Sequence, residues 1–229
     1  MIPTPKLIAW MAAAMLLTTA CKQELYERGD AATSYLRADF VEAYVNGDKR
    51  VDYVITDDGD SVALKTPYQG TWIERSDTVY RALMYYNYGG TTAEAAETKS
   101  MSRVPVLSVK RDAVGTSKWK TDPVGLETIW LSRTKKYLNL GLLLKTGEAD
   151  VEKPQPHTLS VVNRGVRVNK DSTCTAFIAL SHWQGDMPEY YTQRTYLSVA
   201  VDGLEVDSLH ITLNTYNGEV TRAFRLRQK

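Results

Sequence analysis

The sequence predicts an all-β protein: a small five-stranded barrel of the OB type, followed by a seven-stranded β-sandwich. Apolar and polar residues alternate with a period of two along most of the chain, which is the pattern of half-buried strands. Residue types that favour strands are abundant, and tyrosine is unusually frequent, with 14 Tyr against 3 Phe. No segment has the 3.6-residue period of an amphipathic helix of normal length.

Residues 1–20 predict an export signal. Lys6 precedes the apolar run 7–17, which is too short for a membrane span of about 20 residues. The segment Leu17-Thr18-Thr19-Ala20-Cys21 is similar to a bacterial lipobox, and this resemblance implies that Cys21 is acylated and becomes the first residue. Several acyl chains give stable membrane anchoring. The alternatives are an uncleaved helix or a plain secretory signal followed by an incidental cysteine.

The residues that follow the acylated cysteine bear on location and redox chemistry. Lys22, where many inner-membrane lipoproteins have Asp, favours the outer membrane by analogy, and it leaves the membrane face open. Residues 21–35 are expected to form the lipidated cysteine and a tether. Acylation of Cys21 leaves Cys174 without an intrachain partner, so we expect Cys174 to be a buried, inert thiol rather than a nucleophile.

The first strand block is expected at residues 36–112. Asn46-Gly47 is a strong hairpin dipeptide, and the acidic run 57–60 is typical of a second turn. Pro105 marks a strand start or an edge position. We expect five strands that form an OB-like barrel, at residues 39–45, 51–55, 62–64, 78–88 and 104–109.

A linker is expected at residues 113–123, because this stretch has Gly, Thr and Ser and no sustained apolar period. The second block, residues 124–229, begins with a strong alternation of Leu at positions 138, 140, 142 and 144, which commits one strand face to a core. The strand count fits a sandwich. We expect its strands at residues 128–131, 138–144, 159–162, 173–181, 190–201, 209–216 and 220–226.

Several of these segments resemble the NigD-like lipoproteins of Gram-negative anaerobes. The matching segments are residues 77–87, 122–124, 129–132, 137–140, 188–191 and 214–218, together with the lipobox. The resemblance implies an N-terminal OB domain and a C-terminal β-sandwich in a lipoprotein. The family is named after a gene near a bacteriocin locus, and it has no established activity, so no functional residue is carried over.

No motif predicts catalysis, a cofactor or a metal. The three histidines, His157, His182 and His210, lack the spacing of metal ligands, although any of them can meet a carboxylate in the folded chain. The nucleophile elbow, the Walker loop and the dinucleotide fingerprint are all missing from the sequence. We therefore expect a protein that is not an enzyme, while noting that catalytic groups also assemble from distant residues.

Aromatic side chains are the candidate ligand platforms. They suit oligosaccharide binding, and the alternative for each is ordinary packing. Basic residues concentrate between positions 99 and 121, which is also a feature of nucleic-acid grooves, but an export signal places the protein away from cellular nucleic acid. The candidates are Trp72, Tyr85, Tyr86 and Trp183.

Four Asp-Ser/Thr-apolar tripeptides resemble an O-glycosylation acceptor of exported proteins in these anaerobes. The acceptor residues are Ser61, Thr78, Ser172 and Ser208. Turn chemistry at strand starts explains the same tripeptides.

Together these observations predict an outer-membrane-anchored, non-enzymatic lipoprotein that binds envelope components, either glycans or another protein, and no nucleic acid. The alternatives are a bacteriocin-associated or immunity-type lipoprotein and an oligosaccharide-binding surface lipoprotein.

The anchor is tested by Cys21→Ala. Without the acyl chains the protein is expected to move from the membrane fraction to the soluble fraction of lysed cells, because nothing else in the sequence predicts a stable anchor. Fractionation that is unchanged by the substitution contradicts the lipobox assignment.

Overall fold

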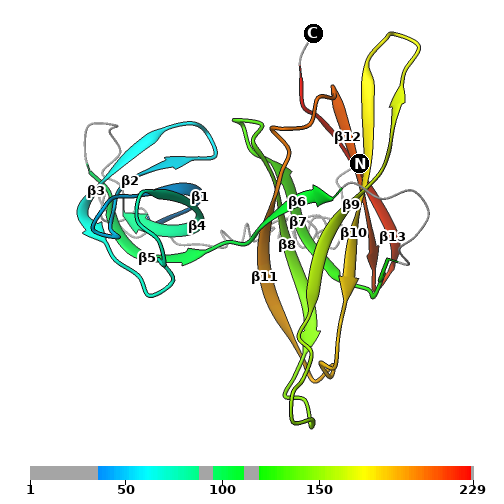
Figure 1. Ribbon diagram of the computed structural model, residues 1–229, viewed down its shortest axis with the longest axis horizontal. Helices are drawn as coiled ribbons and strands as arrows, with labels where there is room; N and C mark the ends of the chain where they lie inside the picture. Colours follow the sequence, from blue (N-terminus) through cyan, green and yellow to red (C-terminus); the bar gives the residue numbers. More distant parts are fainter. Residues whose placement is uncertain (1–35, 88–94, 111–118, 228–229) are drawn as a thin grey trace, which may run out of the picture. The chain divides into compact units, whose positions relative to one another are not determined.

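A computed structural model describes residues 36–87, 95–110 and 119–227 (Figure 1). These residues form thirteen β-strands and no helix, which confirms the all-β prediction. Accordingly, the described residues include no helix long and apolar enough to cross a membrane. Residues 35–229 form one compact unit.

The first five strands form an OB-like half-barrel. Their order in the sheet is β3-β2-β1-β4-β5. A parallel bridge between Leu64 and Ala96 brings the two edge strands together, with a hydrogen bond of 2.8 Å from the Lys65 N–H to the Ala96 carbonyl. This is the partly open barrel that the sequence predicts. The strands are β1 (Leu36–Val45), β2 (Val51–Thr56), β3 (Ser61–Tyr68), β4 (Thr78–Asn87) and β5 (Glu97–Arg103).

The core of the half-barrel follows the predicted alternation. Val41 and Ala43 of β1 are fully buried, and so is Val54 of β2. The predicted hairpin at Asn46-Gly47 is present, and the Asn46 side chain organises it by accepting hydrogen bonds from two main-chain N–H groups of the loop. Local turn chemistry therefore fixes the register of β1 and β2.

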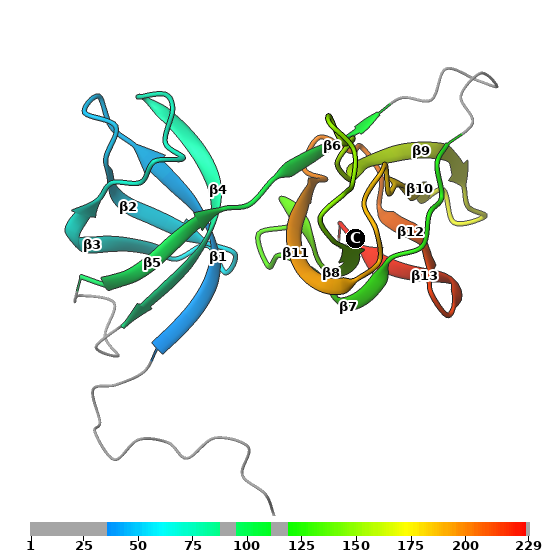
Figure 2. The same cartoon turned by 90° about the horizontal axis from the view of Figure 1, so that it is seen from below.

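The remaining eight strands form one curved sheet whose ends nearly meet (Figure 2). Their order is β13-β12-β10-β9-β6-β11-β8-β7, and a bridge between Val124 and Thr215 links the β7 end to the β12 end. The strands are β6 (Val106–Lys110), β7 (Gly125–Leu131), β8 (Tyr137–Thr146), β9 (Thr158–Val168), β10 (Cys174–Trp183), β11 (Tyr191–Ala200), β12 (Ser208–Thr215) and β13 (Gly218–Arg225).

One strand assignment from the sequence is wrong. The segment 104–109 does not complete the half-barrel; β6 instead pairs in parallel with β11 and with β9, so the second sheet has eight strands rather than seven. The true fifth strand, β5, is polar and buries only Met101, which is why its alternation is invisible. Pro105 separates the two strands, because it cannot donate to a ladder. The predicted linker 113–123 lies partly outside the described residues.

The core of the second sheet contains the predicted leucine face. Leu138, Leu140 and Leu142 of β8 are fully buried, and Leu144 is nearly so. Cys174 packs against the edge of this core and is half-buried rather than fully buried.

Candidate functional site

A small apolar cluster joins the half-barrel to the eight-stranded sheet. Phe40, Leu83 and Val104 are its buried members, and Trp130 and Tyr196 of the second sheet pack against them. The Phe40 ring meets the Trp130 ring edge to face at a centroid distance of 5.1 Å, and it meets Tyr196 in the same way at 5.6 Å. Such edge-to-face contacts are directional, so they fix orientation as well as burying area.

Beside this cluster lies a buried polar network centred on Arg81 of β4. The Arg81 guanidinium lies 2.6 Å from an Asp57 carboxylate oxygen, and it also donates to Asn139 of β8 at 3.1 Å and Ser198 of β11 at 3.2 Å. Asn139 donates in turn to Asp57 at 2.6 Å, and Ser198 donates to Asn139 at 2.7 Å. The Arg81 side chain is only 1% exposed. Every member therefore has a partner, as a buried network requires.

The network costs desolvation energy. Burial raises the pKa of Asp57 above its ordinary value, although Arg81 and Asn139 both act in the opposite direction. For the Asp57 carboxylate, the effect of burial thus exceeds that of its hydrogen-bond partners.

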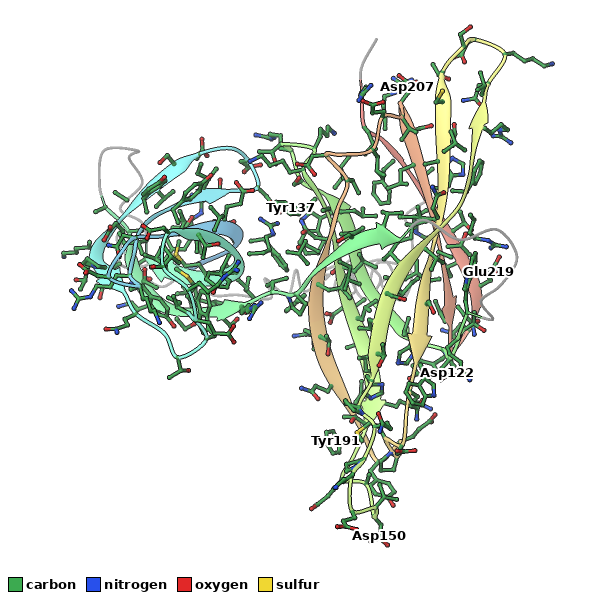
Figure 3. All side chains as sticks on the ribbon, viewed as in Figure 1. Asp122, Tyr137, Asp150, Tyr191, Asp207 and Glu219 are labelled. Atoms are coloured by element: carbon green, nitrogen blue, oxygen red, sulfur yellow. The ribbon has the colours of Figure 1, made fainter. Side chains whose placement is uncertain are left out.

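A second polar bridge supports the first. Glu42 of β1 accepts hydrogen bonds from Lys136 and from the Tyr137 hydroxyl, both at 2.9 Å. Burial, followed by this hydrogen bond to Glu42, raises the pKa of Tyr137 far above its ordinary value. The Arg81 guanidinium also lies over the Tyr137 ring, 4.2 Å from its centroid, and Tyr137 is labelled in Figure 3.

A groove of about 560 Å³ runs beside this network. Its volume is in the range of ligand sites, which favour such positions between packed modules. Phe40 and Trp130 supply apolar surface, and Arg37, Asp39, Asp58 and Arg133 supply charges of both signs. The full lining is Arg37, Ala38, Asp39, Phe40, Thr56, Asp57, Asp58, Trp130, Leu131, Ser132 and Arg133.

The groove follows an open strand edge. β1 pairs with β4 from Leu36 onward, but its pairing with β2 begins only at Val41. The Phe40 carbonyl accepts the Asp57 N–H on the β2 side, and alternate residues of a strand direct their main-chain groups to the same side. The N–H and carbonyl of Ala38 therefore face the groove, where no strand of the described chain pairs with them.

The aromatic candidates from the sequence do not form one platform. Tyr86 is 1% exposed and its hydroxyl donates to Asp39, so it belongs to the core. Trp72 is half-buried between Tyr68 and Tyr80 and donates to the Met101 carbonyl. Tyr85 is exposed on the other face of β4, and Trp183 lies in the second sheet at the end of β10. Ligand binding by Tyr85 and Trp183 stays a prediction.

The sequence does not predict the groove, because the residues that line it come from segments that are far apart in the chain. One signal was present: Arg81 interrupts the otherwise apolar and aromatic strand that was expected at residues 78–88. A lone cation in a buried strand needs a buried partner.

The predicted modification sites occupy different environments. Cys21 lies outside the described residues. Ser61 and Ser172 are exposed, whereas Thr78 and Ser208 are half-buried. The Asp207 carboxylate accepts the Cys174 N–H at 2.7 Å, and Asp171 accepts both the N–H and the hydroxyl of Thr173. Turn chemistry thus accounts for the tripeptide at Asp171, whereas the Asp207 carboxylate binds a residue that is distant in the sequence; glycosylation stays a prediction.

Two of the three histidines meet. His182 Nδ1 lies 3.0 Å from the Asp122 carbonyl, which can only accept, so His182 donates from Nδ1. Its Nε2 then accepts from His157 Nδ1, also at 3.0 Å. This leaves His157 Nε2 buried and without a hydrogen-bond partner among the residues that the structure describes. The described residues contain no group of three or more His, Cys, Asp or Glu side chains suited to a metal ion.

Several solved structures from Bacteroides and Parabacteroides species are similar to this architecture. A NigD-like immunity protein from Bacteroides caccae has a TM-score of 0.60 and 21% identity over 85% of this chain and 99% of that chain. A protein described as toxin-related from Parabacteroides distasonis has a TM-score of 0.64 and 16% identity over 83% and 93% of the two chains. A candidate lipoprotein from Bacteroides fragilis has a TM-score of 0.59 and 9% identity over 85% and 99%.

These similarities confirm, at the level of the fold, the resemblance to NigD-like proteins that the sequence indicates. No protein-family model matches the chain, and no curated protein matches it.

The Arg81 network predicts an asymmetric response to substitution. Arg81→Met leaves Asp57 and Asn139 without their buried donor, and we expect it to cost about 3 kcal/mol of stability, the lower end of the range for a broken buried pair because Asp57 is partly exposed. The double variant Arg81→Met with Asp57→Asn is expected to recover part of this loss. Urea unfolding measures both, with the exposed Arg222→Met as the control. Equal midpoints for Arg81→Met and Arg222→Met contradict the assignment.

The histidine pair predicts a pH dependence. Burial, and next the neighbouring His182, lower the pKa of His157 below its ordinary value of 6.5. The folded state therefore favours neutral His157: its contribution to stability is complete above pH 6.5 and is lost as the pH falls through the folded-state pKa. Between pH 8 and pH 5, the free energy of unfolding measured with urea should fall further for the wild-type chain than for His157→Gln. The control, His210→Gln, should keep the wild-type dependence of stability on pH. If His157→Gln also keeps it, His157 is not responsible for that dependence.

Proposed function

We propose that the protein is an outer-membrane lipoprotein that binds an extended polypeptide segment in the groove beside β1, without catalysing a reaction. The observation that carries the proposal is the edge of β1 at Ala38, which no other strand of the described residues pairs with on the β2 side and which borders a groove of about 560 Å³. An open strand edge is a template for another chain, and many domains bind peptides by adding a strand to such an edge.

The side chains around the edge favour a particular kind of segment. Arg37 and Arg133 carry positive charge, Asp39 and Asp58 carry negative charge, and the Trp130 ring supplies apolar surface. Arg133 and Asp58 lie 3.5 Å apart on the rim and are both well exposed, so a ligand can exchange partners with them at little cost. We infer a segment that carries both acidic and basic side chains, with an apolar residue placed against Trp130.

The predicted anchor supports a site close to a membrane. Arg37 follows Cys21 by roughly 16 residues, which is at most about 55 Å of extended chain. A partner exposed on the same membrane therefore lies within reach of the groove. The Lys22 that follows Cys21 is the reason for choosing the outer membrane.

An immunity-type role is the second candidate. Two of the similar structures are described as a NigD-like immunity protein and as a toxin-related protein. In this role, the protein would protect the cell by binding a peptide toxin in the groove. Inspection of the neighbouring genes tests this role: a bacteriocin gene there would favour it, and genes for glycan uptake would count against it.

The proposal is tested by Ala38→Pro on the chain from residue 22 onward. Proline removes the N–H that faces the groove and leaves the pairing of β1 with β4 intact, because Ala38 directs its main-chain groups away from β4. The matched control, Ala38→Val, retains the N–H. A library of ten-residue peptides of mixed charge supplies the probe, and affinity for the best peptide is measured by fluorescence anisotropy.

Binding to Ala38→Pro is expected to weaken at least tenfold, while Ala38→Val stays within about threefold of the unsubstituted chain. Hydrogen exchange at the Ala38 amide should slow when the peptide binds. The proposal is overturned if no peptide binds, or if Ala38→Pro binds as well as Ala38→Val.

A further inference from the structure

A depression lies on the outer face of the eight-stranded sheet, where two paired strands separate. β10 and β12 run in parallel and remain paired as far as Ala179 and Thr212. Beyond this point the segment 119–124, here called the strap, enters between them and bridges to His182 on one side and to Thr215 on the other. Such a divergence leaves a depression that adjacent side chains do not fill.

The strap is held firmly from both sides. His182 donates its main-chain N–H to the Lys120 carbonyl at 2.9 Å and accepts the Asp122 N–H at 3.0 Å. On the other side, the Asn214 amide donates to the Thr121 carbonyl at 2.6 Å. The buried His182 side chain also binds the Asp122 carbonyl. The strap therefore presents a preorganised rim, which reduces the entropy lost on binding.

The depression has a volume of about 400 Å³. The small Ala179 side chain forms part of its floor, and Trp119 stands at its rim with the Arg164 guanidinium 5.6 Å from the ring centroid. Thr212, Asn214 and Glu219 line the remaining wall. Figure 3 labels Asp122 on the strap and Glu219 on β13.

We propose that this depression is a binding subsite for a neutral oligosaccharide. One wall is an indole ring, whose flat apolar face matches the C–H face of a pyranose. The other wall offers a carboxylate, an amide and a hydroxyl, which are groups that pair with adjacent sugar hydroxyls. The Thr212 hydroxyl and the Asn214 amide N–H already have partners in Thr221 and Thr121, so a sugar would extend these hydrogen bonds rather than replace them.

The charge of the lining distinguishes this ligand from an anionic one. Arg164 is the only cation among the side chains that line the depression, and Glu219 is its only anion. Glu219 is exposed and forms no ion pair within the part of the chain that the structure describes. A polyanion would be repelled by this carboxylate, whereas the hydroxyls of a neutral sugar can donate hydrogen bonds to it. This inference is independent of the peptide groove, because the two sites share no residue.

The test uses the chain from residue 22 onward on an array of neutral oligosaccharides of two to six sugars, with sulfated glycans alongside. The strongest ligand is then titrated by calorimetry. Trp119→Ala and Glu219→Gln are the test variants, and the exposed Tyr190→Ala and Glu205→Gln are their matched controls. Glu219→Gln keeps the shape of a surface side chain, so it reports on binding even if Trp119→Ala perturbs the fold.

A neutral oligosaccharide should bind, with affinity falling at least tenfold in Trp119→Ala and at least threefold in Glu219→Gln. Both controls, and the groove variant Ala38→Pro, should bind it as the unsubstituted chain does. The proposal is overturned if no neutral glycan binds, if both test variants bind like their controls, or if only sulfated glycans bind. Loss of binding in Ala38→Pro would assign the sugar to the groove instead.

Discussion

The buried Arg81 guanidinium is the interaction on which the arrangement of this protein depends. It projects from the half-barrel and finds its partners on both sides: Asp57 in its own module, and Asn139 and Ser198 in the eight-stranded sheet. The edge-to-face contacts of Phe40 fix the orientation of the two surfaces, and the buried cation adds the requirement that its acceptors lie at fixed distances. The groove has one wall from each module, so its shape follows from this constraint.

The sequence predicts the strand faces well and the strand partners poorly. Period-two alternation identifies which side of β8 is buried, because burial is a property of one strand. Pairing is a property of two strands, and the alternation of residues 104–109 is equally compatible with either sheet. The polar β5 illustrates the converse: as an edge strand it buries little, so it lacks the pattern that reveals a strand. Both errors concern strands at the junction of the half-barrel and the eight-stranded sheet, where strand pairing alone decides to which of the two a strand belongs.

The sequence does not locate the candidate sites, for a related physical reason. The ligand platforms were predicted from aromatic identity, which is a weak guide in a chain with 14 Tyr and 3 Phe. Tyrosine performs core packing here when a carboxylate accepts its hydroxyl, as Asp39 does for Tyr86. The aromatic residues that line the two sites are Phe40, Trp130 and Trp119, and each site lies where a strand loses a neighbour. Strand ends and divergences therefore locate sites better than residue type does.

The two hollows differ in the kind of recognition that they support. At the open edge of β1 the main chain supplies hydrogen-bonding groups, which are common to every peptide, so the groove depends on its charged rim for discrimination. In the depression beside the strap, Thr212 and Asn214 are held in place by hydrogen bonds to Thr221 and Thr121, so a ligand must place its hydroxyls at fixed positions to reach them. Tight selectivity is thus expected for the oligosaccharide and broad selectivity for the peptide. A lipid-anchored protein with both binding sites would bind many different polypeptide segments at a membrane surface, but only one kind of glycan.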